Sequence, residues 1–342
     1  MTAGRRGRNV SEEVIVYRCI LVPLDGTAFG EAALPLAVSI ASRTGALLQL
    51  AHVHLPPIVP SGAETAALPP VWLEMSSEEK RRYLDEVAER LARGSGVRVE
   101  TRVVEGSVAT SLERHALSCA VGLVVMSTHW HVGLGRLWHN GVADQLARDL
   151  PLPVLLVRVP EEARAAPAAV DRPIRNILVP LDGSAEAELI LEHAVSLGRP
   201  FDARLTLLQV VNPAGKGSGP TMVDDPASPP VALQSRTAAR QYLNGLAERL
   251  RRHGVDVVTE VLVGEAVART VLEHVHAARD DDLRRVDVIA LRAPSRGPVS
   301  RLLFQGTADQ LIRESGVPVL LFEAGGVPED PVAARVGLVG SG

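Results

Sequence analysis

The chain contains a long internal repeat, which restricts its possible folds more than any other feature. Residues 20–26 (ILVPLDG) recur letter for letter as residues 177–183. Shorter matches follow in the same order, and the last of them pairs 153–156 with 318–321 (PVLL). The offset between the matches grows only from 157 to 165 residues. A period of this length predicts two whole domains, because the units of a solenoid are far shorter.

The composition of the chain restricts which cellular compartment and which classes of partner the sequence predicts. With 36 Lys and Arg against 40 Asp and Glu the net charge is -4, so we expect no nucleic-acid partner. The two cysteines, Cys19 and Cys119, form no Cys-x-x-Cys pair, which favours a reduced, cytoplasmic setting. No apolar run approaches the roughly 18 residues of a membrane span, and no apolar signal core follows the N-terminal arginines. The sequence therefore predicts a cytoplasmic chain without a membrane partner.

Both halves alternate strand and helix patterns. In the first half we predict strands at 18–24, 46–54, 97–105, 123–126 and 153–157, and helices at 31–41, 77–93 and from about Val108. In the second half we predict strands at 175–181, 204–211, 255–263, 286–291 and 318–322, and helices at 186–197, 232–252 and from about Ala266. Charges that include Lys80 suggest a solvated face on the helix at 77–93. The alternation predicts an α/β fold of two tandem doubly wound domains, each with a five-stranded parallel sheet.

These patterns also divide the chain. We predict a flexible N-terminus at 1–17, a first domain at 18–158, a linker at 159–173, a second domain at 174–323 and a flexible tail at 324–342. Segments rich in Pro, Gly and Ser at 56–76 and 212–230 predict long loops after the second strand of each domain. The closing strands are apolar edges that invite partner strands. We therefore expect the domains to pair within the chain through these strands, and a homodimer could use the same strand five.

The repeated signatures point to one family. The strand-one motif ending in Pro-Leu-Asp-Gly, the segment after strand four and the closing Pro-Val-Leu-Leu occur twice in the same order. Together they resemble the universal stress protein family in its tandem form, over about 20–158 and 175–323. The resemblance implies Rossmann-like domains of the adenine nucleotide alpha hydrolase type, a dimer contact through the last strand, and a candidate site for ATP or another adenine nucleotide.

The phosphate side of that site departs from the family. Nucleotide-binding members carry Gly, two residues, Gly, nine residues, Gly, then Ser or Thr after strand four. Glycines there let backbone N–H groups approach a phosphate beside a helix N-terminus. The four positions are Ser127, Trp130, Asn140 and Gly141 in the first copy, and Arg292, Ser295, Gln305 and Gly306 in the second. None matches the pattern, and the large ring of Trp130 could block the first pocket.

The second copy offers another way to hold an anion. Arg292, Arg296 and Arg301 could bind a phosphate through their side chains in place of loop amides. The alternative is that they are surface arginines without a ligand.

The base side of the site is better preserved. Asp25 and Asp182 end strand one, where open α/β sheets place ligands, although an Asp before Gly is also an ordinary turn residue. The resemblance implies candidate binding positions in the first copy at Pro23, Asp25, Val53, Met126, Ser127, Asn140, Gly141 and Val142. In the second copy it implies Pro180, Asp182, Val210, Arg292, Ser295, Gly306 and Thr307.

Histidines of the first half suggest a rival chemistry. His52 and His54 share one face of a strand, and His129, His131 and His139 follow strand four. His54, His129 and either His131 or His139 could converge on zinc, nickel or copper, or these histidines could be ordinary polar strand-end residues. We assign no metal ligand.

Catalysis has no evident site in the sequence. No nucleophile elbow, phosphate-binding Gly-x-x-x-x-Gly-Lys-Ser/Thr loop or His-Glu-x-x-His motif is present. Cys119 lies in an apolar helical stretch with no evident base and is interpreted as core packing. We therefore expect a non-enzymatic stress-response module with weak or absent ATP binding and no certain cofactor. The alternatives are an ATP or AMP sensor whose nucleotide orders the loops after strand two, and a metal-binding first domain.

Overall fold

The computed structural model describes residues 17–54, 76–128, 142–158, 173–212, 231–282, 284–292 and 307–323. The elements of the first half are β1 (Cys19–Leu24), α1 (Ala28–Glu31), α2 (Leu34–Thr44), β2 (Leu47–His54), α3 (Ser77–Ser95), β3 (Val99–Glu105), α4 (Val108–Ser118), β4 (Leu123–Thr128), α5 (Val142–Asp149) and β5 (Val154–Arg158). The predicted strands are all present. The helix predicted at 31–41 corresponds to α2, which begins later because the chain turns after the short, unpredicted α1.

The second half repeats this order. Its elements are β6 (Asn176–Pro180), η4 (Ala187–Leu189), α6 (Ile190–Gly198), η5 (Arg199–Phe201), β7 (Arg204–Val211), α7 (Val231–Arg252), β8 (Val257–Val263), α8 (Val267–Ala277), β9 (Val288–Arg292), α10 (Thr307–Glu314) and β10 (Val319–Phe322). The predicted loops at 56–76 and 212–230 and the predicted linker lie almost wholly outside the described residues, as do the two termini. None of the helices in the described part of the chain is long and apolar enough to cross a bilayer.

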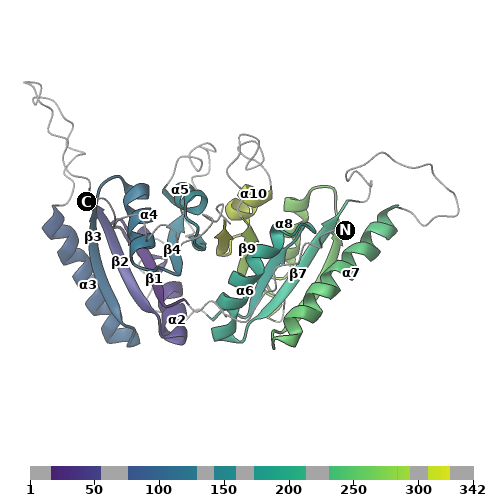
Figure 1. The fold of residues 1–342 in the computed structure, drawn as a ribbon, viewed down its shortest axis with the longest axis horizontal. Coiled ribbons are helices and arrows are strands. Elements are labelled where there is room, and N and C mark those ends of the chain that lie inside the picture. The colour runs from purple at the N-terminus through teal and green to yellow at the C-terminus, as the bar shows by residue number, and fades with distance from the viewer. Residues whose placement is uncertain are drawn as a thin grey trace, which may run out of the picture.

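The strands form one continuous sheet in the order β3-β2-β1-β4-β5-β10-β9-β6-β7-β8. Pairing is parallel within each half, as predicted, but β5 and β10 pair antiparallel, with Leu155 opposite Leu320. The two predicted sheets are therefore halves of a single sheet (Figure 1). This pairing occupies the inner edge of both closing strands, so a homodimer through strand five would require them to part. The outer edges of the sheet belong to β3 and β8.

Helices cover both faces of the sheet. In Figure 1, α4, α5, α8 and α10 lie above it, and α2, α3, α6 and α7 lie on the other side. The strand sequences explain this arrangement, because successive side chains point to opposite faces. In β4, Leu123 and Val125 join one buried cluster and Val124 and Met126 join the other. Strands that are apolar at every position need such cover on both sides.

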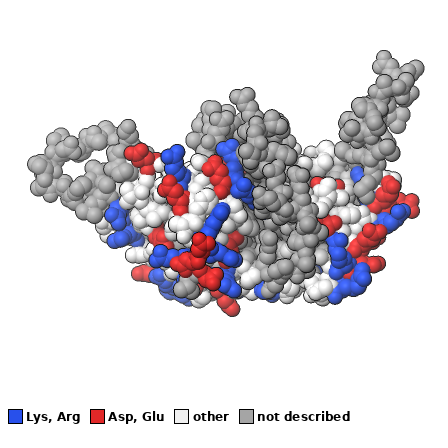
Figure 2. All heavy atoms as spheres, turned by 180° about the vertical axis from the view of Figure 1, so that it is seen from behind, with Lys and Arg blue, Asp and Glu red and all other residues white. Residues whose placement is uncertain are grey.

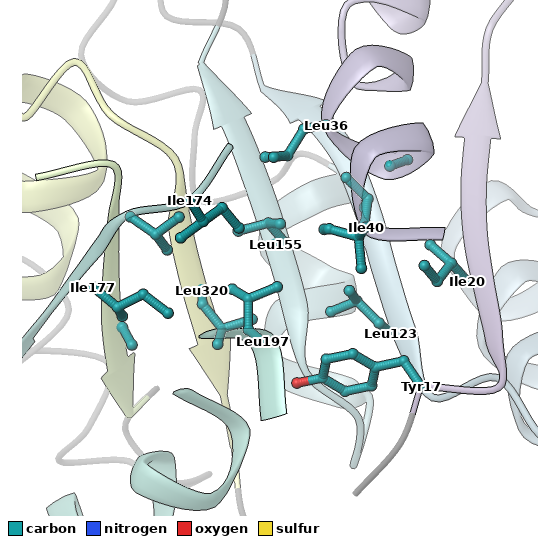
Figure 3. Close-up of a cluster of buried hydrophobic side chains, with 14 of the residues drawn as sticks. Tyr17, Ile20, Leu36, Ile40, Leu123, Leu155, Ile174, Ile177, Leu197 and Leu320 are labelled. Atoms are coloured by element: carbon teal, nitrogen blue, oxygen red, sulfur yellow. The ribbon is translucent and has the colours of Figure 1, made fainter. Parts of the chain in front are cut away.

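Both of these cores contain residues of both halves. Figure 3 shows Ile20, Leu123 and Leu155 of the first half in the same cluster as Ile177 and Leu320 of the second. The halves are therefore joined by buried apolar surface as well as by the β5–β10 hydrogen bonds.

Polar contacts reinforce this junction. The buried Tyr17 hydroxyl donates to the backbone carbonyl of His193 on α6 over 3.1 Å. The Arg43 guanidinium lies 4.7 Å from the centre of the Phe201 ring, within the range of a cation–π contact. The imidazole of His193 packs against Phe322, with ring centres 4.0 Å apart. Burial lowers the pKa of this imidazole to about 4, so it is neutral at pH 7.

Positive and negative side chains are mixed on the described part of one molecular face. On the face in Figure 2, Lys and Arg side chains alternate with Asp and Glu, and no field of one sign covers its described part. That face therefore lacks the basic stripe of a nucleic-acid-binding surface.

Candidate functional site

The sheet order creates the same crevice position in each half. β1 lies between β2 and β4, and β6 lies between β7 and β9. The chain thus leaves these neighbouring strands in opposite directions, and open α/β sheets bind ligands outside the carboxyl ends of strands at such a switch point. Asp25 and Asp182, which follow β1 and β6, lie at these two positions.

The side chain of Asp25 accepts hydrogen bonds within its own turn. Its Oδ1 accepts hydrogen bonds from the Thr27 N–H over 3.0 Å and from the Thr27 hydroxyl over 2.6 Å. Thr27 Oγ1 in turn accepts from the Gly30 N–H over 3.1 Å and caps α1. Gly26 makes the turn feasible, because its φ of 82° is one that side-chain-bearing residues rarely adopt. The aspartate therefore stabilises the turn between β1 and α1.

Asp182 repeats this arrangement in the second half. Its Oδ1 accepts from the Ser184 N–H over 2.9 Å and from the Ser184 hydroxyl over 2.6 Å. Ser184 Oγ accepts from the Ala187 N–H over 3.1 Å, and Gly183 has a φ of 90°. Of the two roles that the sequence left open, the structure shows the turn role in both copies.

A second repeated group lies beside these turns. The Tyr83 hydroxyl on α3 donates to Glu31 Oε1 over 3.0 Å, and Arg90 forms an ion pair with the same carboxylate. Burial, followed by the negative charge of Glu31, raises the pKa of the Tyr83 hydroxyl, which therefore stays protonated as a donor. The group ties α3 to the short helix after Asp25.

The second half holds the equivalent residues together. Arg249 and Glu188 form an ion pair of 2.9 Å, and burial and the charge of Glu188 raise the pKa of Tyr242. Sequence reasoning missed both groups. A signal was present, since Arg90 and Arg249 occupy the same place in the repeated AERL segment.

The two copies differ at the end of strand two. Lys80 on α3 is 3 % exposed, and its ammonium donates to the Val53 carbonyl at the end of β2 over 3.0 Å. The solvated role expected for Lys80 was wrong, because its side chain turns under α3 toward the strand ends. In the second half the corresponding residue is the buried Ala239. At this position the first crevice thus has a buried ammonium where the second has a methyl group.

The remaining candidate positions of the first copy are only partly described. Met126 is buried in the core under α4 and α5, and Val53 packs against that core. Pro23 lies in β1, Ser127 lies in β4 and Val142 begins α5. Trp130, Asn140 and Gly141 lie outside the described residues.

The second copy shows one unusual feature. Arg292 ends β9, and its Nε is buried with no hydrogen-bond partner in the described part of the chain. Val210 packs against the core, Pro180 ends β6, and Thr307 begins α10. Ser295, Gln305, Gly306, Arg296 and Arg301 lie outside the described residues.

The histidines do not form a metal site in what is described. His52 Nδ1 lies 3.0 Å from the Val53 carbonyl oxygen, and its ring meets Tyr83 edge-on at 6.2 Å. Across the described ranges, no three His, Cys, Asp or Glu side chains gather closely enough to hold a metal ion. His129, His131 and His139 lie outside those ranges.

Cys119 requires a correction. It packs against the core beneath α4, as expected, but the expectation of no neighbouring base was wrong. Its Sγ lies 3.7 Å from Nδ1 of His115, one helical turn earlier on α4. A spacing of four residues on a helix was the signal that sequence reasoning passed over.

Both halves of the chain match the same known protein family. A family model described as the universal stress protein family matches residues 17–158 and again 173–323. A universal stress protein of Methanocaldococcus jannaschii is 28% identical over 162 residues, which cover 46% of this chain and 88% of that protein. Universal stress protein YxiE of Bacillus subtilis is 28% identical over 148 residues, which cover 42% of this chain and 100% of that protein.

One solved structure matches both halves of the chain together. The crystal structure of a universal stress protein from Archaeoglobus fulgidus superposes with a TM-score of 0.63 and 16% identity, covering 91% of this chain and 98% of that one. The arrangement of both halves in one molecule is thus shared at the level of the fold.

Proposed function

The chain belongs to the universal stress protein family, with one family domain in each half, and from this premise we propose a non-enzymatic stress-response module of the cytoplasm. In this proposal both nucleotide loops are degenerate and ATP is bound weakly or not at all. The observation that carries it is the shared turn of Asp25 and Asp182. A structural role accounts for the repetition of these aspartates, so their presence does not require a ligand.

The phosphate side supports the same conclusion. Three of the four pattern positions in each copy carry side chains in place of the glycines that would let backbone N–H groups reach a phosphate, and the last has Gly in place of Ser or Thr. In the first crevice, the buried ammonium of Lys80 already holds the end of β2. Both cysteines are free thiols, as a reducing compartment would keep them.

Isothermal titration with ATP, with and without Mg²⁺, tests this proposal. We expect no saturable heat at millimolar nucleotide. Saturable binding near one ATP per chain would overturn it. Asp182→Asn is the informative variant in that case, because Asn keeps the oxygen that accepts the turn hydrogen bonds and removes only the charge.

A second candidate function is an adenine-nucleotide sensor that works through the second domain alone. Arg292 favours it, because a buried guanidinium Nε without a described partner at the end of β9 would suit an anion. If ATP binds, Arg292→Gln should abolish binding and the first-domain variant Lys80→Ala should not; the reverse result would exclude this candidate.

A further inference from the structure

A chain of three polar side chains crosses the first domain on the face opposite Lys80. It begins at Gln49, a buried residue of β2 that is 3 % exposed, and continues to His115 on α4. Gln49 Oε1 lies 2.8 Å from His115 Nε2, and His115 Nδ1 lies 3.7 Å from Cys119 Sγ. None of these residues belongs to the nucleotide crevice.

The hydrogen bond to Gln49 Oε1 sets the tautomer of His115. A carboxamide oxygen only accepts, so Nε2 must donate its proton to Gln49. The lone pair of the neutral ring then lies on Nδ1, the atom that faces the thiol. Burial, and secondly the positive charge of Arg102, lower the pKa of His115, so the ring is neutral and able to accept a proton at pH 7.

This arrangement has the parts of an activated nucleophile. The thiol is the nucleophile, His115 is a base within reach of its proton, and Gln49 orients that base. Helix geometry keeps the pair in register, because the Cys119 N–H donates to the His115 carbonyl over 3.0 Å and ends α4. Ser118 adds a hydroxyl 3.7 Å from the sulfur.

The group borders an open cavity. His115 and Ser118 form part of its wall, with Arg102 and Glu105 of β3 and Arg114 of α4. A small polar molecule can therefore reach the residues next to the thiol from solvent. The second half has no such site, because Ala278 occupies the position of Cys119, and His274, the counterpart of His115, lies 3.5 Å from Glu260 instead.

We propose that Cys119 is a modification site that reacts with hydroperoxides, with His115 as its base and Gln49 as the positioning residue. The thiol proton passes to His115 Nδ1 as the sulfur attacks one peroxide oxygen and the O–O bond breaks. With hydrogen peroxide, the sulfur is oxidised to sulfenic acid, and the departing hydroxide takes the proton from His115 and leaves as water. This activity is independent of nucleotide binding and goes beyond the proposed stress-response module.

Cys19 serves as an internal reference. It is buried at the start of β1, and burial, followed by the neighbouring Cys119, raises the pKa of its thiol. A thiol of this kind is a poor nucleophile. Cys119 should therefore be oxidised faster than Cys19 in the same molecule.

The test measures the rate of Cys119 oxidation in the intact protein. Hydrogen peroxide is added, sulfenic acid is trapped with dimedone, and peptides are mapped by mass spectrometry. We expect labelling at Cys119 and none at Cys19, with a rate at least about tenfold lower in His115→Gln, given the usual size of general-base effects. The matched control is His274→Gln, which removes the equivalent histidine of α8 and should leave the rate unchanged.

Two further measurements distinguish a role of His115 as a base from a purely structural role. Near pH 10, where hydroxide ionises a thiol directly, the rates of the wild type and His115→Gln should converge. If His115→Gln does not fold, Gln49→Leu keeps His115 and removes only its orienting partner, and it should also slow labelling. Equal labelling of Cys19 and Cys119, or equal rates in the wild type and both variants near pH 7, would overturn the proposal.

Discussion

Replacing His193 with Leu tests whether the junction between the halves contains a neutral imidazole. The buried ring lies against Phe322, which packs on one of the shared cores, and its Nδ1 has no hydrogen-bond partner among the described residues. The equivalent residue of the first half is Leu36, which is also buried. The substitution therefore introduces the residue that the repeat itself carries there. Near pH 8 we expect the variant to be as stable as the wild type, or slightly more stable.

The magnitude at lower pH follows from the pKa. Burial lowers the pKa of His193 to about 4, against an ordinary value of 6.5. Between these values the unfolded chain binds a proton that the folded chain does not, so the free energy of unfolding falls as the pH falls. The loss amounts to about 2 kcal/mol near pH 5 and approaches about 3 kcal/mol below pH 4. The free energy of unfolding of His193→Leu should not show this loss at low pH.

Urea unfolding followed by circular dichroism measures the effect. The informative quantity is the difference in free energy of unfolding between the variant and the wild type, compared near pH 8 and near pH 5. His253→Leu, at an exposed position after α7, is the control for removing a histidine. If the difference between His193→Leu and the wild type stays constant over this pH range, the imidazole is not held neutral by burial and the reasoning is refuted.

Three further substitutions probe other contacts, each by urea unfolding. Leu155→Ala opens a cavity in the fully buried centre of β5 and should cost about 2–5 kcal/mol; a loss below about 1 kcal/mol would mean that the junction can collapse around it. Ser76→Ala removes the capping box of α3 with Glu79 and should cost about 1 kcal/mol, whereas an unchanged midpoint would show that the cap is not formed in solution. Tyr83→Phe removes the hydrogen bond to Glu31 and should cost about 1 kcal/mol; no loss would speak against that contact.

Much of the fold could be read from local pattern. The strand at 204–211 has the predicted bounds, and every other predicted strand appears within a few residues of its place. These segments are apolar at nearly every position because helices cover both faces of the sheet, and such a run is recognisable from its own residues. The exact repeat of residues 20–26 likewise indicated two copies of one domain.

The candidate site was less accessible to sequence reasoning. The positions of Asp25 and Asp182 were correctly placed at the ends of β1 and β6, but whether the carboxylates build the turn depended on hydrogen-bond geometry. Lys80 resembles any charged residue on a solvated helix, and only the packing of α3 against the sheet places it under the helix. The pairing of Cys119 with His115 was visible as a spacing, yet its orientation by Gln49 depends on a strand 66 residues away.

The sequence by itself thus determined the two copies, their strands and helices, and their parallel order, because each of these depends on residues close along the chain. Only the tertiary structure decided how the copies join. The β5–β10 pair, the two shared cores and the contact from Tyr17 to His193 across 176 residues depend on surfaces that exist only once both halves have folded. The same reason applies to the buried charge of Lys80 and to the oriented thiol of Cys119, since burial and orientation are properties of the packed molecule.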